Sequence, residues 1–310
     1  MKDSRFDEIW QQQVLPFLKK YDDERRKAQL WYLLAFLAFV GLMPVLINIE
    51  FGLPNLLVYL GGFVGLTSIV SLFLLKVDYV SKFRAGVAQG INQVADFHWL
   101  INKDGQEHAH SGEKVLEKSG LYYGWDDVIV RDQLTAAAGE ETVVEAYKVQ
   151  TEREDDGERK AAIPIFHGFI ARVPVSNSFG GETYVQTEAD SSFIDYSAGG
   201  LFDNKTGIKK TELEWGEFEQ FLEVKSSSPA EARRVFTPDF MSVLYDWWRD
   251  HDKELRISFR GDSMYIGWPT DIRLDPNLLG GVENERESVR DIIEFVLMLE
   301  GLVKTLKENK

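Results

Sequence analysis

Residues 30–49 have the sequence LWYLLAFLAFVGLMPVLINI, and residues 56–75 have the sequence LLVYLGGFVGLTSIVSLFLL. Neither run contains a charged side chain. Each has the length of about 20 residues that an α-helix needs to cross the hydrocarbon core of a bilayer. One alternative is a pair of helices buried in a soluble core, but such helices are usually shorter and interrupted by polar residues. The other is a cleaved signal peptide, but its apolar run is shorter and lies nearer the N-terminus. The two runs therefore predict a transmembrane helical hairpin at residues 30–75.

The connector between the two runs, EFGLPN at residues 50–55, has the composition of a tight turn. Gly52 supplies a flexible backbone, and Pro54 stops the first helix from continuing. Within the second run, Gly61 and Gly65 have the spacing that lets a neighbouring helix approach closely in lipid. We therefore expect the two helices of the hairpin to pack against each other.

Basic residues flank the hairpin on both of its outer sides, and the connector contains none. Positive charge is retained on the cytoplasmic side of a membrane, so both termini are predicted to be cytoplasmic. The basic residues before the hairpin are Lys19, Lys20, Arg25, Arg26 and Lys27, and those after it are Lys76, Lys82 and Arg84.

Charge and cysteine content exclude several classes of function. The chain has 310 residues and no cysteine, so it can form neither a disulfide nor a thiolate metal site. From residue 91 onward there are 42 acidic and 25 basic residues, a net charge of about −17. Such a surface repels phosphate backbones, which argues against nucleic-acid binding, and it argues against a distal domain that lies flat on anionic lipid.

Two amphipathic helices are predicted on either side of the hairpin. Residues 4–28 carry apolar side chains at helical spacing, and Pro16 is expected to bend or split this helix. Residues 76–100 continue as a long helix out of the membrane, which can pack against the N-terminal helix or pair between protomers. The apolar stripe of the first is Phe6, Ile9, Trp10, Val14, Phe17, Leu18 and Tyr21, and that of the second is Phe83, Val87, Ile91, Val94 and His98.

Residues 113–310 are predicted to form an α+β domain with a mainly antiparallel sheet. The longest strand is expected at residues 163–175, bulged at Gly168 and paired with a strand at 182–187. Residues 255–268 predict a hairpin that turns at Gly261 and Asp262. Further short strands are expected at 121–123, 128–130, 143–150 and 221–225, and helices after Ser228, after Thr237 and at 287–306.

The predicted organisation therefore has four parts. They are an amphipathic N-terminal helix (1–29), the transmembrane hairpin (30–75), a juxtamembrane helix with a polar connector (76–112), and a cytoplasmic α+β domain (113–310).

No motif identifies a catalytic, cofactor-binding or metal-binding residue. His98 is predicted to be a packed or half-exposed residue rather than a ligand. His108 and His110 are expected in a loop without a third ligand, so metal binding is not predicted there. Gly180 and Gly181 lack the spacing of a phosphate-binding loop. Glutamates at 212, 214, 217, 219 and 223 can form an acid or cation site, but their spacing is more typical of a solvated helix face.

Three segments together resemble a known family. They are Ile165–Phe169 with Phe179–Val185, Phe221–Ala232 with Phe236–Met241, and Ile257–Phe259 with Met264–Ile266. With the preceding hairpin, they resemble an uncharacterised bacterial family of two-helix membrane proteins, known as domain of unknown function 3137, over roughly residues 20 to 300. The resemblance implies the bacterial inner membrane as the location, and no activity.

Three functions remain open at this point. The first is a membrane-anchored module that binds a protein partner or forms a homo-oligomer, and we expect it to be no enzyme. The second is an enzyme whose site combines scattered residues such as His167 and His251. The third is an oligomeric channel or transporter component lined by polar residues of the hairpin, namely Asn48, Thr67, Ser68 and Ser71.

Overall fold

The computed structural model describes most of the chain outside the predicted hairpin. The described residues are 6–8, 10–20, 22–23, 26–27, 29–31, 33, 80–103, 106–138, 141–153, 163–175, 178–187, 207–251, 254–272, 274 and 285–308. They divide into two compact units. The sheet unit contains Val94–Ile272 and Asp291–Lys310, and the helical unit contains Lys2–Gln93 and Arg273–Arg290.

A single antiparallel sheet forms the sheet unit. Within the described residues it has nine strands in the order β1-β2-β3-β4-β9-β8-β5-β7-β6. The prediction of a mainly antiparallel β domain is therefore confirmed. The strands are β1 (His98–Lys103), β2 (Asp127–Ala138), β3 (Glu141–Arg153), β4 (Ile163–Pro174), β5 (Thr183–Thr187), β6 (Lys209–Lys210), β7 (Leu222–Ser226), β8 (Arg256–Arg260) and β9 (Ser263–Pro269).

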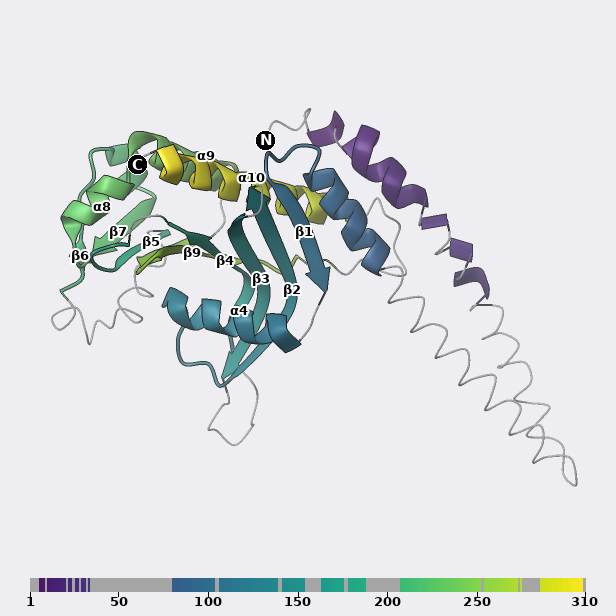
Figure 1. Ribbon diagram of the computed structural model, residues 1–310, viewed down its shortest axis with the longest axis horizontal. Helices are drawn as coiled ribbons and strands as arrows, with labels where there is room; N and C mark the ends of the chain where they lie inside the picture. Colours follow the sequence, from purple (N-terminus) through teal and green to yellow (C-terminus); the bar gives the residue numbers. More distant parts are fainter. Residues whose placement is uncertain are drawn as a thin grey trace, which may run out of the picture. The chain divides into compact units, whose positions relative to one another are not determined.

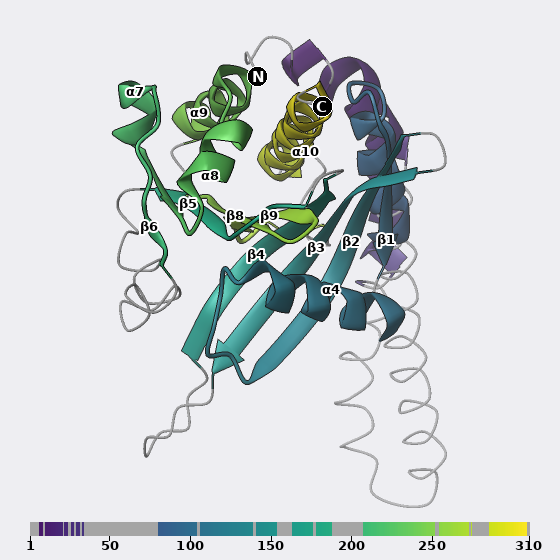
Figure 2. The ribbon, with the colours of Figure 1, turned by 60° about the vertical axis from the view of Figure 1, so that its left-hand side comes forward.

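Helices flank both faces of this sheet. Figures 1 and 2 show α4 (Gln106–Ser119) on one face, and α8 (Pro229–Val235), α9 (Pro238–His251) and α10 (Arg286–Glu308) on the other. The short helix α7 (Gly216–Glu219) precedes β7. The predicted helix starts at Ser228 and Thr237 and the predicted C-terminal helix are confirmed.

Each face of the sheet has its own apolar core. Under α10, Trp268 of β9 stacks on Phe295 at a centroid distance of 4.6 Å, and Phe169 of β4 lies 5.8 Å from Phe295. Under α4, Tyr122 stacks on Phe166 at 3.9 Å. The helical stripe of α10 is buried from Ile292 to Val303, because its three- and four-residue spacing keeps these side chains against the sheet.

The hairpin of β8 and β9 forms as predicted. Arg260 pairs with Ser263 across the two-residue turn, and Gly261 has a φ of +60°. Two-residue hairpin turns need a positive φ at the first central position, which glycine adopts without strain.

The predicted pairing of residues 163–175 with 182–187 is wrong. β4 pairs with β3 and β9, whereas β5 pairs with β7 and β8. The predicted bulge at Gly168 is also wrong, because the irregularity between β3 and β4 lies between Thr151 and Glu152. A Cβ at Gly168 would lie 2.1 Å from the carbonyl oxygen of Trp268, so the glycine permits close approach of β9.

Three local predictions between residues 76 and 123 are wrong. The helix predicted to reach residue 100 ends at Ile91, and residues from His98 form β1. The predicted polar connector contains α4. Leu121–Tyr123 is not a strand in the described structure. Glu300 of α10 holds the start of β1 in place. Its carboxylate accepts hydrogen bonds from the Asp96 and Phe97 amides and from the Trp99 indole.

In the helical unit the juxtamembrane helix packs against the N-terminal helix, which is one of the two arrangements that the sequence left open. Residues 80–91 are helical, and a Cβ at Gly90 would lie 2.4 Å from Val14. A π-helical turn at Trp10–Val14 precedes Pro16, and residues 15–20 continue as an α-helix. Proline lacks the amide that would complete the preceding turn, so Pro16 changes the helix locally without ending it.

The predicted hairpin at 30–75 lies outside the described residues except for Leu30, Trp31 and Leu33. Among the residues that are described, no helix has both the length and the apolarity to cross a bilayer.

Candidate functional site

Aromatic side chains gather where α7 and the start of β7 meet α9. Phe221 stacks on Trp248 with ring centroids 4.5 Å apart, and Tyr245 lies 5.2 Å from Trp215 and 6.1 Å from Phe221. Trp215, Phe221 and Trp248 are half-buried, and 9 % of Tyr245 is exposed. These rings therefore form a continuous cluster with one side open to solvent.

The local sequence of α9 places two of these rings on the same side. Pro238 is the first residue of α9, and the Thr237 hydroxyl accepts a hydrogen bond from the Phe240 amide at 3.4 Å. Phe240 and Leu244 are fully buried toward the sheet. Tyr245 and Trp248 are three residues apart, so they neighbour each other on the helix surface.

Exposed carboxylates border the aromatic cluster. The Tyr245 hydroxyl donates a hydrogen bond to Glu217 Oε1 at 2.8 Å, and this bond to a carboxylate raises the pKa of Tyr245. Glu214 and Asp246 are also exposed, and they are the sequence neighbours of Trp215 and Tyr245. Within the described part of the chain, neither Glu214 nor Glu217 has a basic ion-pair partner. We call Trp215, Phe221, Tyr245, Trp248, Glu214, Glu217 and Asp246 the aromatic–acidic surface.

One arginine of the chain already lies on this surface. The Arg249 guanidinium is centred 5.7 Å from the Tyr245 ring, and its Nη2 lies 3.1 Å from Asp246 Oδ1. A guanidinium is attracted both to the face of an aromatic ring and to a carboxylate. The surface therefore has the chemistry to hold a cation of this shape.

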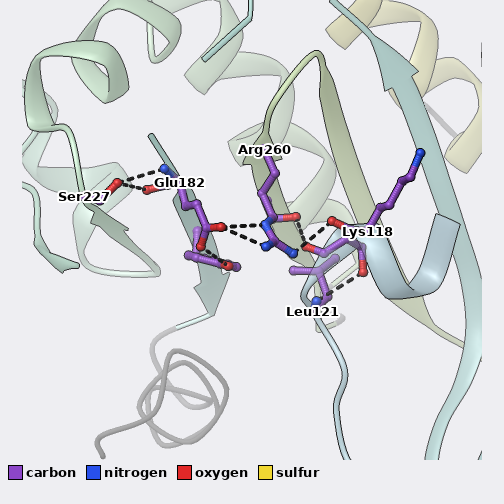
Figure 3. Close-up of polar contacts among 8 residues, drawn as sticks. Lys118, Leu121, Glu182, Ser227 and Arg260 are labelled. Carbon is purple, nitrogen blue, oxygen red and sulfur yellow. Dashed lines mark hydrogen bonds and ion pairs between the residues drawn. The ribbon is translucent and has the colours of Figure 1, made fainter. Parts of the chain in front are cut away.

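A second polar cluster lies at the end of α4. Arg260 donates to Glu182 Oε1 from Nε at 3.0 Å and from Nη2 at 2.8 Å, and its Nη1 donates to the Lys118 carbonyl at 3.0 Å (Figure 3). The Ser227 hydroxyl accepts a hydrogen bond from the Glu182 amide at 2.9 Å. These contacts tie together the end of α4, the start of β5 and the end of β8. We interpret the cluster as structural because its charges are matched within the domain.

Tyr184 completes this cluster from β5. Its hydroxyl donates to Glu182 Oε2 at 2.9 Å, and only 4 % of the residue is exposed. Burial raises the pKa of the Tyr184 phenol well above its ordinary value of 10.0. The folded state therefore keeps this phenol neutral at a pH where the unfolded chain ionises it.

This shift predicts a loss of stability at alkaline pH. The raised pKa of Tyr184 contributes stability below pH 10.0, and that contribution is lost as the pH rises from there toward the folded-state pKa. The Tyr184→Phe variant should be less stable near neutral pH, because it loses the bond to Glu182, and should show a shallower decline above pH 10.0. Urea unfolding on both sides of this pH measures the slopes; equal slopes for the two proteins would contradict the prediction.

A buried polar row crosses β7, β5 and β8 beside this cluster. Gln186 pairs in register with Glu223 and Arg256, and its carboxamide has no hydrogen-bond partner among the described residues. Glu223 lies 3.9 Å from the ammonium groups of Lys210 and Lys225. The Glu223 carboxylate is therefore paired with lysines of the domain, whereas the Gln186 carboxamide has no hydrogen-bond partner among the described residues.

The histidines considered from the sequence belong to four different elements, β1, α4, β4 and α9. His98 is exposed in β1, so the prediction of a helical position is wrong. His108 and His110 belong to α4 rather than to a loop, and residues two apart on a helix do not share a face. His167 Nδ1 lies 3.1 Å from Asp271 Oδ1, and His251 is the last residue of α9. Among the described residues, no group of three His, Asp or Glu side chains is arranged to hold a metal ion.

The glutamates at 212–223 do not converge on one site. Glu212, Glu214 and Glu217 are exposed, as a solvated face predicts. Glu219 accepts a hydrogen bond from the Leu213 amide, and Glu223 faces lysines of the sheet. Only Glu217 and Glu219 belong to a helix, the short α7, and Glu223 belongs to β7.

Tyr245 was not predicted from the sequence to be a functional residue, and neither was the contact of Trp215 and Phe221 with α9. The available signal was the three-residue spacing of Tyr245 and Trp248 beside exposed acids. Only the folded chain shows that these rings meet those of α7 and β7.

No curated protein matches the chain. Among solved structures, the crystal structure of the mycobacterial trehalose monomycolate transport factor A, TtfA, is similar at 12 % identity and a TM-score of 0.33, covering 71 % of this chain and 94 % of that chain. The sequence profile of the family described as "Protein of unknown function (DUF3137)" matches residues 164–308, which confirms the resemblance for this part of the chain rather than for residues 20 to 300.

Proposed function

We propose that this chain is a membrane-anchored module that binds another protein through the aromatic–acidic surface of its sheet unit. The observation that carries the proposal is the cluster of half-buried Trp215, Phe221 and Trp248 around Tyr245. Tryptophan and tyrosine are enriched among the residues that dominate binding energy at protein interfaces. Elsewhere in the sheet unit, Trp99 and Trp268 are fully buried, and Trp125 is half-buried against the core under α4.

The N-terminal helix supports the membrane anchor. Its described end exposes 59 % of Leu30, 73 % of Trp31 and 54 % of Leu33, where the first uncharged run begins. Tryptophan is enriched at membrane–water interfaces, and the apolar side chains beside it lose contact with water in lipid. Basic residues on both outer sides of the hairpin support a cytoplasmic sheet unit. Release of the full-length protein by alkaline washing of membranes would contradict the anchor.

Co-purification tests the binding function. The full-length chain, extracted in mild detergent, should retain a stoichiometric protein partner. The Trp248→Ala variant should retain about tenfold less, because truncation of an interface tryptophan removes a large share of the binding energy. Mass spectrometry identifies the partner and native mass measures the stoichiometry.

The control is Tyr123→Ala, which removes an aromatic ring that is 40 % exposed outside the aromatic–acidic surface. It should retain the partner at the wild-type level. Thermal unfolding must show that both variants are folded. A monomer without a partner, or equal loss in both variants, would overturn the proposed function.

A further inference from the structure

We infer that the partner presents an arginine side chain to the aromatic–acidic surface. Its guanidinium lies over the rings of Trp215 and Tyr245 and faces the carboxylates of Glu214 and Glu217. This inference rests on the proposed function and names the chemistry of the partner.

Arg249 shows how the surface holds a guanidinium. Its charged group lies over the Tyr245 ring at 5.7 Å and beside Asp246 at 3.1 Å. Both side chains of this ion pair are more than half exposed, so water competes for the contact. A second guanidinium that also contacts Glu217 would use the same two kinds of attraction.

The part of the surface beside Trp215 and Glu217 offers such a position. The ring centroids of Trp215 and Tyr245 lie 5.2 Å apart with an interplanar angle of 51°. The Glu217 carboxylate accepts a hydrogen bond from the Tyr245 hydroxyl. Glu214 and Glu217 are exposed and have no basic ion-pair partner in the described ranges. Carboxylates beside half-buried rings favour a cation over an anion or a neutral apolar group.

Arginine fits this position better than lysine does. Its planar guanidinium stacks on an aromatic face and still donates in-plane hydrogen bonds to a carboxylate, whereas an ammonium is a compact and strongly hydrated point charge. The net charge of about −17 from residue 91 onward also attracts a basic segment over a longer range. A basic, arginine-bearing segment of another protein is therefore the occupant.

Labelled peptides test the inference on the full-length chain in an uncharged detergent. A peptide of alternating glycine and arginine should bind, a glycine–lysine peptide of the same length should bind about threefold more weakly, and a glycine–glutamate peptide should not bind. Glu217→Gln should weaken binding of the arginine peptide about fivefold, because it removes the charge of the carboxylate and keeps its size. Fluorescence anisotropy measures all the affinities.

Two further variants separate a specific site from general attraction. Glu117→Gln on α4 changes the net charge equally at an exposed residue and should leave binding unchanged. Arg249→Gln should strengthen binding about threefold, because it removes a positive charge of the chain that lies beside Tyr245 and repels the arginine of the peptide.

Several results would overturn the inference. They are equal weakening by Glu117→Gln and Glu217→Gln, equal affinity for the arginine and lysine peptides, or binding of the glutamate peptide. If a protein partner is lost in Trp248→Ala while the peptides show one of these results, the arginine assignment fails and the proposed binding function stands. If no partner is retained at all, the proposed function fails with it.

Discussion

Replacing Trp268 by alanine is expected to lower the free energy of unfolding of the sheet unit by about 4 kcal/mol. The indole is fully buried, stacks on Phe295 at 4.6 Å, and lies 5.9 Å from both Phe169 and Trp247. Truncation removes a large apolar side chain and leaves a cavity between the sheet and its helices. The surrounding rings can fill that cavity only in part, because they belong to different elements.

Chemical denaturation of the full-length protein, followed by circular dichroism, measures this change. Trp268→Phe is the matched control, because it keeps an aromatic ring and most of the packing. We expect it to cost about 1–2 kcal/mol. A Trp268→Ala variant that unfolds at the same denaturant concentration as the control would show that Trp268 is not central to this core.

Replacing Gly168 by alanine is expected to destabilise the sheet unit by about 3 kcal/mol. The new Cβ would lie 2.1 Å from the carbonyl oxygen of Trp268 and 2.8 Å from Cα of Pro269. Both atoms belong to the backbone of β9, which is paired in register with β4 at this point. The clash therefore requires the two strands to separate, and a side-chain rotation does not relieve it.

Gly216→Ala is the control for this prediction. Gly216 is the first residue of α7, and a Cβ there meets no atom within 4 Å. Alanine favours the helix, so the stability should change by less than about 1 kcal/mol. If denaturation shows the same stability for Gly168→Ala and Gly216→Ala, the close approach of β4 and β9 is not what requires glycine at residue 168.

Elements with strong local signals could be predicted from the sequence. The β8–β9 hairpin has alternating residues on both sides of Gly261 and Asp262, and α10 has an apolar stripe of several turns. Both signals come from neighbours in the chain, so they survive without knowledge of the partner elements.

Weak local signals led to the wrong predictions. α4 buries Val115 and Leu116, but its first turns are polar and resemble a loop. β1 is short and exposes 49 % of Leu100, and it is held by Glu300, which lies 201 residues from Trp99. Such elements are stable only because a distant part of the chain packs against them.

The aromatic–acidic surface also depends on contacts between distant segments. Trp215 and Phe221 precede α9, and each has an ordinary core pattern in its own segment. Their rings meet Tyr245 and Trp248 only after β7 joins the sheet and α9 packs beside it. No functional residue was predicted here from the sequence, because no single segment contains the site.

The sequence alone was enough to show two uncharged runs with basic flanks, an acidic surplus from residue 91 onward, and the elements with strong periodicity. Each of these properties is a sum over neighbouring residues, so it can be calculated without coordinates. The order of the strands, the pairing of β5 with β7 and β8, and the meeting of Trp215 with Tyr245 required the folded chain. Those features arise from hydrogen bonds and packing between segments that are far apart in the sequence, where no local pattern records which partner is chosen.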